Sequence, residues 1–265
     1  GFWPFLFVII GVMAGLCALG VQARATTASE EYSDAVDVAD FLQIDEEEQR
    51  DQFAELALSR MKYITSRSLC GKKGEWLAFV DLYEEYQDGL PTANYVLQRG
   101  TLQYGVQPLP ENAKTSTLYV GAKTFYSKAD KQSMFAFRTA PPLAMPSTAN
   151  MDEVKMSVTA GRQTTTIQLQ ERYPSRDFED IKVVLQEMAP AYASYIQKRD
   201  GSFDHAFLRL RSYVTDAETL GRVYSWELTL VAEESLPSKG IVIRYDCDTG
   251  QVAGAVNREI RSYFG

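Results

Sequence analysis

The stretch VYSWELTLVA at residues 223–232 has the clearest secondary-structure pattern in the sequence. Its side chains alternate strictly, with the apolar set Tyr224, Trp226, Leu228 and Leu230 and the polar set Ser225, Glu227 and Thr229. A period of two residues is typical of a β-strand, whose successive side chains point to opposite faces of a sheet. The alternation therefore predicts a strand with one face buried in a core and one face in water.

Similar patterns lie on both sides of this strand. Residues 202–212, 240–246 and 251–257 are strand-like in composition, and Asp248-Thr249-Gly250 favours a hairpin turn between the last two. Upstream, residues 178–199 place apolar side chains on one side at helical spacing, and Pro190 is expected to kink this helix. The last third of the chain therefore predicts one helix followed by an antiparallel meander of four strands.

This ending resembles the PepSY and cystatin-like class of small α+β modules over about residues 177–257. The resemblance is carried by VYSWEL at 223–228 and by YDCDTGQV at 245–252, a strand followed by an Asp-x-x-Thr-Gly turn. Cys247 and the long connection at 233–239 depart from the pattern of the class. The resemblance implies a module that binds or inhibits other proteins, or that serves as a structural appendage.

The first half of the chain shows the same order of elements. Residues 45–65 predict a helix, with Asp45 as its N-cap and glutamates in its first turn. Residues 75–86 fit a helix or a strand, because their Trp, Phe, Val and Tyr residues suit both. The stretches expected to follow as antiparallel strands are 95–104, 116–126 and 133–138. A duplicated module is one interpretation, although no residue-level repeat accompanies it.

Three prolines in APPLAMPSTAN at 140–150 mark the internal boundary. The predicted division is a transmembrane anchor at 1–23, an acidic juxtamembrane spacer at 24–44, a first module at 45–139, a Pro-rich linker at 140–150 and a second module at 151–265. The expected fold class is α+β, with a single N-terminal transmembrane helix followed by one or two helix-plus-antiparallel-sheet modules of the cystatin or NTF2-like kind.

The predicted transmembrane helix comes from FWPFLFVIIGVMAGLCALGV at residues 2–21, which carries no charge. About twenty apolar residues are enough to span the hydrocarbon core of a bilayer. Small residues at helical spacing predict an intramembrane packing face. They are Gly11, Ala14, Gly15 and Ala18. An alternative is a secretory signal cleaved at Ala25, which would release a secreted binding or inhibitor protein.

The net charge of −8 is distributed unevenly along the chain. Residues 30–51 hold ten acidic residues and one arginine, so the remainder is close to neutral. Neither a nucleic-acid-binding protein, which needs a basic stripe, nor a polybasic lipid-binding segment fits this distribution. One basic set is expected either to form a solvated face or to receive an acidic partner. It comprises Lys198, Arg199, Arg209, Arg211 and Arg222.

Residues able to perform chemistry are few. The single histidine, His205, is expected to pack within a strand rather than act as a general base, and one histidine with two distant cysteines does not suit zinc. Cys70 and Cys247 could form one disulfide or remain as two buried thiols. Asp246 and Asp248 suit an ordinary turn better than a calcium loop. We therefore expect no catalytic residues, no cofactor and no metal site.

The expected function is that of a non-catalytic, single-span accessory or scaffold subunit of a multi-protein membrane complex. Its soluble domain would be extracytoplasmic, in the periplasm or an equivalent compartment. Its partners would be other membrane-protein subunits, contacted through the apolar helix and the folded domain. A second interpretation is a secretion or envelope scaffold of the bitopic kind, resembling the VirB8 or NTF2-like group, which would associate with itself.

Overall fold

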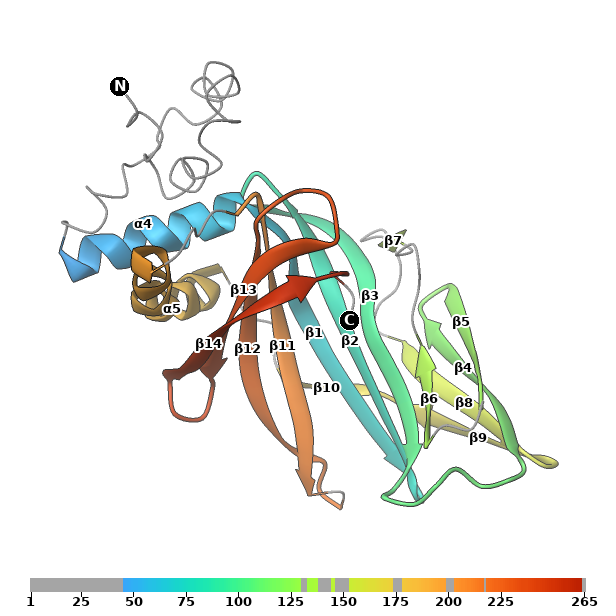
Figure 1. Cartoon of the computed structure of the whole chain (residues 1–265). Coiled ribbons are helices and arrows are strands. Elements are labelled where there is room, and N and C mark those ends of the chain that lie inside the picture. The colour runs from blue at the N-terminus through green and yellow to red at the C-terminus, as the bar shows by residue number, and fades with distance from the viewer. Residues whose placement is uncertain are drawn as a thin grey trace.

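The computed structural model describes residues 45–129, 133–137, 144–145, 153–173, 178–198, 203–216 and 218–263 (Figure 1). The described helices are α4 (Glu46–Ser59) and α5 (Phe178–Lys198). The strands of the first part are β1 (Met61–Lys73), β2 (Trp76–Gln87), β3 (Leu90–Tyr104), β4 (Ala113–Val120), β5 (Lys123–Lys128), β6 (Met134–Phe137) and β7 (Ala144–Met145). Those of the second part are β8 (Val154–Ala160), β9 (Gln163–Gln168), β10 (Gln170–Tyr173), β11 (His205–Asp216), β12 (Gly221–Val231), β13 (Ser238–Asp246) and β14 (Gln251–Ile260).

Most of these strands form one ten-stranded sheet. Its order is β14-β13-β12-β11-β1-β2-β3-β6, with β10 also beside β1 and β7 beside β3. Its pairs are antiparallel except for β1 and β11, which run parallel in the middle. A separate four-stranded sheet has the order β5-β4-β8-β9. Because α4 precedes β1 and α5 precedes β11, the two helix-then-meander segments meet at this central parallel pair.

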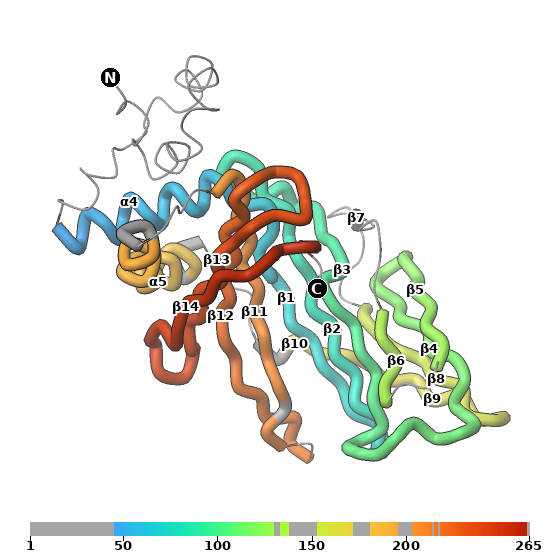
Figure 2. Tube along the Cα trace, viewed as in Figure 1, coloured from blue at the N-terminus to red at the C-terminus, as the bar shows by residue number. Residues whose placement is uncertain are grey.

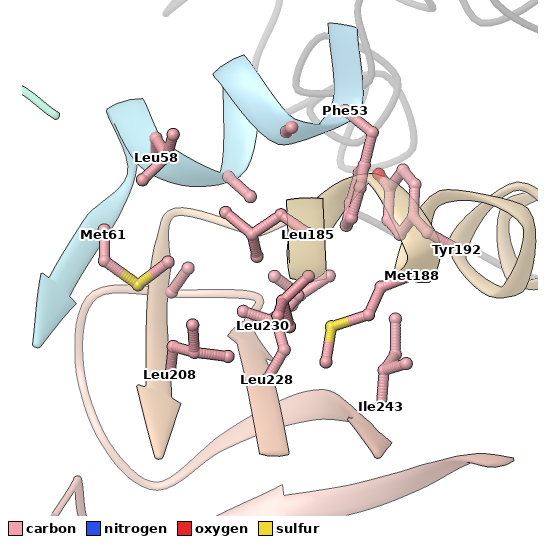
Figure 3. Packing of buried hydrophobic residues seen from close by; sticks show 14 of the residues in the cluster. Phe53, Leu58, Met61, Leu185, Met188, Tyr192, Leu208, Leu228, Leu230 and Ile243 are labelled. Atoms are coloured by element: carbon pink, nitrogen blue, oxygen red, sulfur yellow. The ribbon is translucent and has the colours of Figure 1, made fainter. Parts of the chain in front are cut away.

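The two helices lie together over one face of the large sheet (Figure 1) and form what we call the helix core. Figure 3 shows Phe53 of α4 beside Tyr192 of α5, and their ring centroids are 4.7 Å apart. From the sheet, Leu208, Leu228 and Ile243 point up into the same core, and each has no exposed surface. The alternating apolar set of the strand at 223–232 is therefore buried against helices, as its pattern predicts.

The four-stranded sheet covers another part of the same face and forms the sandwich core. Val80 of β2 and Leu102 of β3 meet Leu118 of β4 and Met156 of β8 there, and all four are completely buried. Val80 and Tyr86 are an even number of residues apart on β2, so their side chains point to the same face of the sheet. Val80 lies in the sandwich core and Tyr86 lies in the helix core. One face of the large sheet therefore supports both cores.

The large sheet curls, so its β14 end reaches across the face opposite the helices (Figure 2). Tyr263, just after β14, contacts the ring of Tyr63 on β1 and the ring of Phe207 on β11. Tyr83 of β2 donates a hydrogen bond to the backbone carbonyl of Tyr263 at 3.2 Å. Because β2 and β14 are far apart in the strand order, only a curled sheet brings these residues together. The opposite face is therefore partly enclosed.

Some of the secondary-structure predictions for the first half of the chain are confirmed, and others are wrong. The N-cap at Asp45 is confirmed, because its Oδ1 accepts a hydrogen bond from the Glu48 backbone N–H at 3.0 Å. The helix predicted at 45–65 nevertheless ends at Ser59, since the chain turns at Arg60 and enters β1. Residues 75–86, which fit either element, form strand β2. The strand predicted at 116–126 is a hairpin, because Gly121 adopts a left-handed φ of 55° in its turn.

The predicted α+β fold class is wrong, because the described part of the chain is mainly β-sheet with two helices. The physical reason is that both meanders join into one large sheet, and that a further sheet replaces helices as the cover over half of it. Helices α4 and α5 cover only the remainder. The helix-plus-sheet modules expected from the sequence thus belong to a β-rich fold.

The single-pass membrane prediction is also corrected. Among the residues that the structure describes, no helix is both long enough and apolar enough to cross a bilayer. This finding is what the structure sets against the predicted transmembrane helix and membrane location, which are not proposed again. The segment 2–21, the cleavage alternative at Ala25 and the intramembrane packing face lie outside the described residues. That packing face was predicted from Gly11, Ala14, Gly15 and Ala18.

The predicted linker at 140–150 is described only at β7, which pairs with β3. Strands from before and after this point lie in both sheets, and residues from both segments fill both cores. The division into a module at 45–139 and a module at 151–265 stays a prediction, to which we return with a test.

Candidate functional site

Buried polar side chains gather where β1 changes its neighbour. β1 pairs with β11 as far as Ile64 and with β10 from Ser68 onward, so β11 and β12 diverge from β1 and β2 (Figures 1 and 2). Thr65 lies at this divergence and is 3% exposed. Its hydroxyl accepts a hydrogen bond from the Leu210 backbone N–H at 2.9 Å and donates one to Gln98. A side chain thus satisfies a backbone donor where the ladder between strands ends.

Glu227 of β12 is the centre of an ion-pair network on the face opposite the helices. Its carboxylate lies 2.6 Å from the guanidinium of Arg209, 3.2 Å from that of Arg211 and 3.6 Å from that of Arg244. Glu227 is only 2% exposed. Burial opposes its ionisation, but the hydrogen bonds and charges of Arg209 and Arg211 outweigh burial and lower the pKa of Glu227. One ionised carboxylate therefore holds three arginines.

Asp81 of β2 is the second buried carboxylate. It is 4% exposed, and its Oδ1 accepts a hydrogen bond from the Ser68 hydroxyl at 2.7 Å. Burial raises the pKa of Asp81, and the nearby positive charges of Arg222 and Arg99 offset only part of that shift. Buried carboxylates with a perturbed pKa and a charged partner are enriched at functional sites.

Arg222 joins the two diverging halves of the sheet. Its guanidinium donates hydrogen bonds to the hydroxyl of Ser68 on β1, at 3.1 Å, and to that of Ser212 on β11. It also lies over the rings of Phe79 and Tyr224, at 4.9 and 5.5 Å from their centroids. Such stacking suits the planar guanidinium of arginine and fixes its orientation.

Arg99 of β3 completes the group that we call the arginine cluster: Arg99, Arg209, Arg211, Arg222 and Arg244. Its pKa is lowered by burial, an effect that Asp81 opposes and that the charges of Arg211, Arg222 and Arg209 increase. Within the described part of the chain, Arg99 makes no ion pair and no side-chain hydrogen bond. Three of these arginines share the carboxylate of Glu227, and Arg99 and Arg222 both act on Asp81, so the five like charges lie in one region of the protein.

A second candidate is the free edge of the large sheet. Within the described residues β14 pairs only with β13, and its positions from Ala253 to Glu259 are all exposed. From Gln251 to Asn257 it has no charged residue and no proline. At the other end of the sheet, by contrast, short strands β6 and β7 cover the edge of β3. β14 is therefore a long strand that is open to another strand.

The residues predicted to be chemically quiet are found in ordinary settings. His205 lies on β11 with its Nε2 3.8 Å from Glu234, and burial together with Lys62 lowers its pKa. Asp246 closes the β13–β14 turn by accepting hydrogen bonds from the backbone N–H groups of residues 248 and 249, as expected for a plain turn. No group of three potential metal ligands is found among the residues that the structure describes.

Cys70 and Cys247, the predicted disulfide candidates, are not bridged to each other and belong to different clusters. Cys70 is buried beside Phe79 and Leu220, whereas Cys247 packs against the helix core. Whether the two cysteines form a disulfide or remain thiols in the protein stays a prediction.

The predicted basic set was partly right. Arg209, Arg211 and Arg222 do come together, while Arg199 and the side chain of Lys198 lie outside the described residues. The sequence reasoning missed Asp81, Arg99 and Arg244. A signal for Asp81 was available, because it is the single charge within the apolar run WLAFVDLY of β2. No comparable signal marks Arg99 or Arg244, since their positions depend on how distant strands pair.

The polar face predicted for residues 223–232 also needs correction. Glu227 and Thr229 were expected in water, but each is 2% exposed. The curl of the sheet is the reason, because it carries β13, β14 and Tyr263 toward this face. A period-two pattern reports which face is apolar, and it does not report whether the other face becomes covered.

Three comparisons with known proteins were made for this chain. No protein-family model matches it, and searches of curated proteins and of solved structures give no significant match. The resemblance to PepSY and cystatin-like modules therefore stays a prediction, and function has to be argued from the geometry.

Proposed function

We propose that this protein is a non-enzymatic scaffold module that assembles with a second copy of itself by strand addition at β14. The observation that carries the proposal is the open edge of β14, ten residues long and exposed on both faces for most of its length. Protein–protein interaction by a non-catalytic module was also the expectation from the sequence. The membrane anchor that accompanied that expectation is not part of the proposal.

Edge strands are usually protected, because their unpaired N–H and C=O groups can pair with another chain. Protection normally takes the form of charged side chains, proline, bulges or a covering element. β14 has one register shift, at Ala253, and its charged residues Arg258 and Glu259 lie near its end. Between them Gly254 and Ala255 are small and neutral, and Val256 is 53% exposed. Such an edge favours addition of an extended strand, in which backbone hydrogen bonds supply the affinity.

A second copy supplies a matching strand. In a symmetric antiparallel pair centred on Ala255, each Gly254 would face Val256 of the other copy, on the C-terminal side of the register shift that β14 has at Ala253. No like charges then lie opposite one another, and like charges directly opposite would destabilise the pair. The interface would be isologous, which closes at two copies and does not continue into a fibre.

The test is sedimentation of the full chain over a range of concentrations, for matched lysine variants. Val256→Lys places a charge on the open edge and should convert dimers to monomers. Val183→Lys is the control, because Val183 on α5 is exposed to the same extent (52% against 53%) but lies far from β14 in the chain and on a different element. Its mass should equal that of the wild type. Both positions are exposed, so neither change should perturb folding by more than about 0.5 kcal/mol.

A charge-exchange experiment examines the register. Ala255→Lys and Ala255→Glu should each be monomeric alone, because like charges meet at the centre of the pair. Mixed together, they should form a heterodimer. A wild-type chain that is monomeric throughout, or dimers that survive both Val256→Lys and Ala255→Lys, would overturn the proposal.

A further inference from the structure

The arginine cluster has an excess of positive charge. Its five guanidinium groups face two carboxylates, Asp81 and Glu227, so three positive charges have no acidic counterpart within the cluster. The excess lies in a protein whose net charge is −8, so it does not follow from overall composition. Three of the arginines share the single carboxylate of Glu227.

The like charges are held together by the fold. Arg211 is held by its ion pair with the buried carboxylate of Glu227, which also binds Arg209. Arg222 is held by hydrogen bonds to Ser68 and Ser212 and by stacking on two aromatic rings, those of Phe79 and Tyr224. This leaves little freedom for the guanidinium groups to move apart. Repulsion between fixed like charges lowers the stability of the folded state, and a bound anion would remove that cost.

The cluster is open to solvent at its outer members. The side chains of Arg211 and Arg244 are 42% and 55% exposed. Arg99 is exposed as a residue, although the atoms around its guanidinium lower its pKa by partial desolvation. Arg99 has no ion-pair partner among the described residues, so its donors are available to a ligand. Buried charges that position exposed donors are the arrangement expected of a preorganised binding site.

We propose that the arginine cluster binds an oxyanion of the phosphate or phosphate-ester class, contacted by Arg99 and Arg211 and held electrostatically by Arg209, Arg222 and Arg244. Arginine forks match two oxygens of such a group at once. A phosphate group carries up to two negative charges, which would neutralise two of the three excess positive charges of the cluster. A single carboxylate would neutralise only one of them. Arg244 pairs with Gly254 of β14, but the other four arginines lie on β3, β11 and β12, and the site does not depend on self-assembly.

Titration calorimetry of the full chain at low salt tests this proposal. The probes are inorganic phosphate, phenyl phosphate as a simple phosphate ester, and acetate as a single carboxylate. Inorganic phosphate or phenyl phosphate should bind at least about tenfold more tightly than acetate, and the stronger of the two shows whether a free or an esterified group is preferred. Equal binding of all three, or no binding of the two phosphates, would overturn the proposal.

Variants separate a built site from general attraction of anions. Arg99→Gln and Arg211→Gln should each weaken binding of the preferred phosphate by at least about tenfold, since each removes charge-assisted hydrogen bonds. Arg162→Gln is the control, because Arg162 is an exposed arginine in the β8–β9 turn. Arg99→Lys keeps the charge without the fork and should fall between wild type and Arg99→Gln.

A second readout guards against a purely structural effect. In wild type the phosphate should raise the unfolding temperature, and in folded Arg99→Gln this rise should be lost whatever the unfolding temperature without ligand. If Arg162→Gln weakens binding as much as Arg99→Gln does, the attraction is diffuse and the proposal fails. Val256→Lys should bind the phosphate as wild type does, so failure of the self-assembly proposal leaves this result unaffected.

Discussion

The two buried carboxylates respond to their surroundings in opposite directions, which makes their pH dependence a sharp test. The folded-state pKa of Asp81 is raised above its ordinary value of 3.8 by burial. The stability that this group contributes is therefore fully present below about pH 3.8 and is lost as pH rises through the folded-state pKa. Asp81→Asn, which keeps an acceptor for Ser68, should unfold at a higher temperature than wild type at neutral pH. The difference should vanish in acid.

Glu227 is the matched contrast at the same scale. Its folded-state pKa is lowered, so its contribution is present above the ordinary value of 4.5 and is lost as pH falls through the folded-state pKa. Glu227→Gln leaves Arg209 buried without its carboxylate and should lower the free energy of unfolding by about 3 kcal/mol at neutral pH. Thermal unfolding of both variants across pH provides the measurement. Shifts of the same sign for both would contradict the assigned environments.

The burial of the strand around Glu227 was predictable from the sequence only for one of its two faces. The two neighbours of Glu227 in the sequence, Trp226 and Leu228, were correctly predicted to be buried, because a two-residue apolar period in a strand is enough to predict one buried face. The environment of Glu227 was not, because a glutamate in a wet strand and one beneath a curled sheet look alike in sequence. Arg99 and Asp81 meet through pairing of β2 with β3, which is register information that a single sequence does not contain.

At the scale of the elements, helix α5 contains Pro190, which cannot donate a backbone hydrogen bond, and a side chain of helix α4 supplies the donor instead. Pro190 has no N–H, so the Gln186 carbonyl one turn earlier lacks its usual donor. Arg50 of α4 donates to that carbonyl at 3.3 Å. Pro190→Ala should restore the donor within α5 and raise stability by up to about 3 kcal/mol. Arg50→Ala should then cost about 1 kcal/mol less in the Pro190→Ala background than in wild type.

Chemical denaturation of the four proteins in this double-mutant cycle gives the coupling energy. Arg50 also pairs with Glu46 at 2.7 Å and Glu187 at 3.1 Å, and those pairs are present in both backgrounds, so the cycle cancels them. A coupling of zero would show that the carbonyl of Gln186 gains nothing from Arg50. The sequence predicted both the helix and a disturbance at Pro190, but the compensating donor comes from a helix more than a hundred residues earlier in the chain.

At the scale of the whole molecule, element types were predictable and their assembly was not. Caps, turns and periodicity located the start of α4, the whole of α5 and the strands of the last third within a few residues, but they extended α4 six residues too far. Nothing local specified that β1 and β11 would pair in parallel, or that the β8–β9 hairpin would join β4 in a second sheet. Those contacts join residues far apart in the chain, and they turn two expected helix-plus-sheet modules into a β-rich fold with shared cores.

Shared cores lead to the last prediction, which concerns the predicted division at 140–150. Leu228 in the helix core and Leu118 in the sandwich core are both completely buried. Leu228→Ala and Leu118→Ala should each destabilise by about 3 kcal/mol. Because both segments fill both cores, each variant should move one common calorimetric transition, with equal calorimetric and van't Hoff enthalpies. If each variant instead shifted a different transition and left the other in place, the chain would consist of two independently folding modules after all.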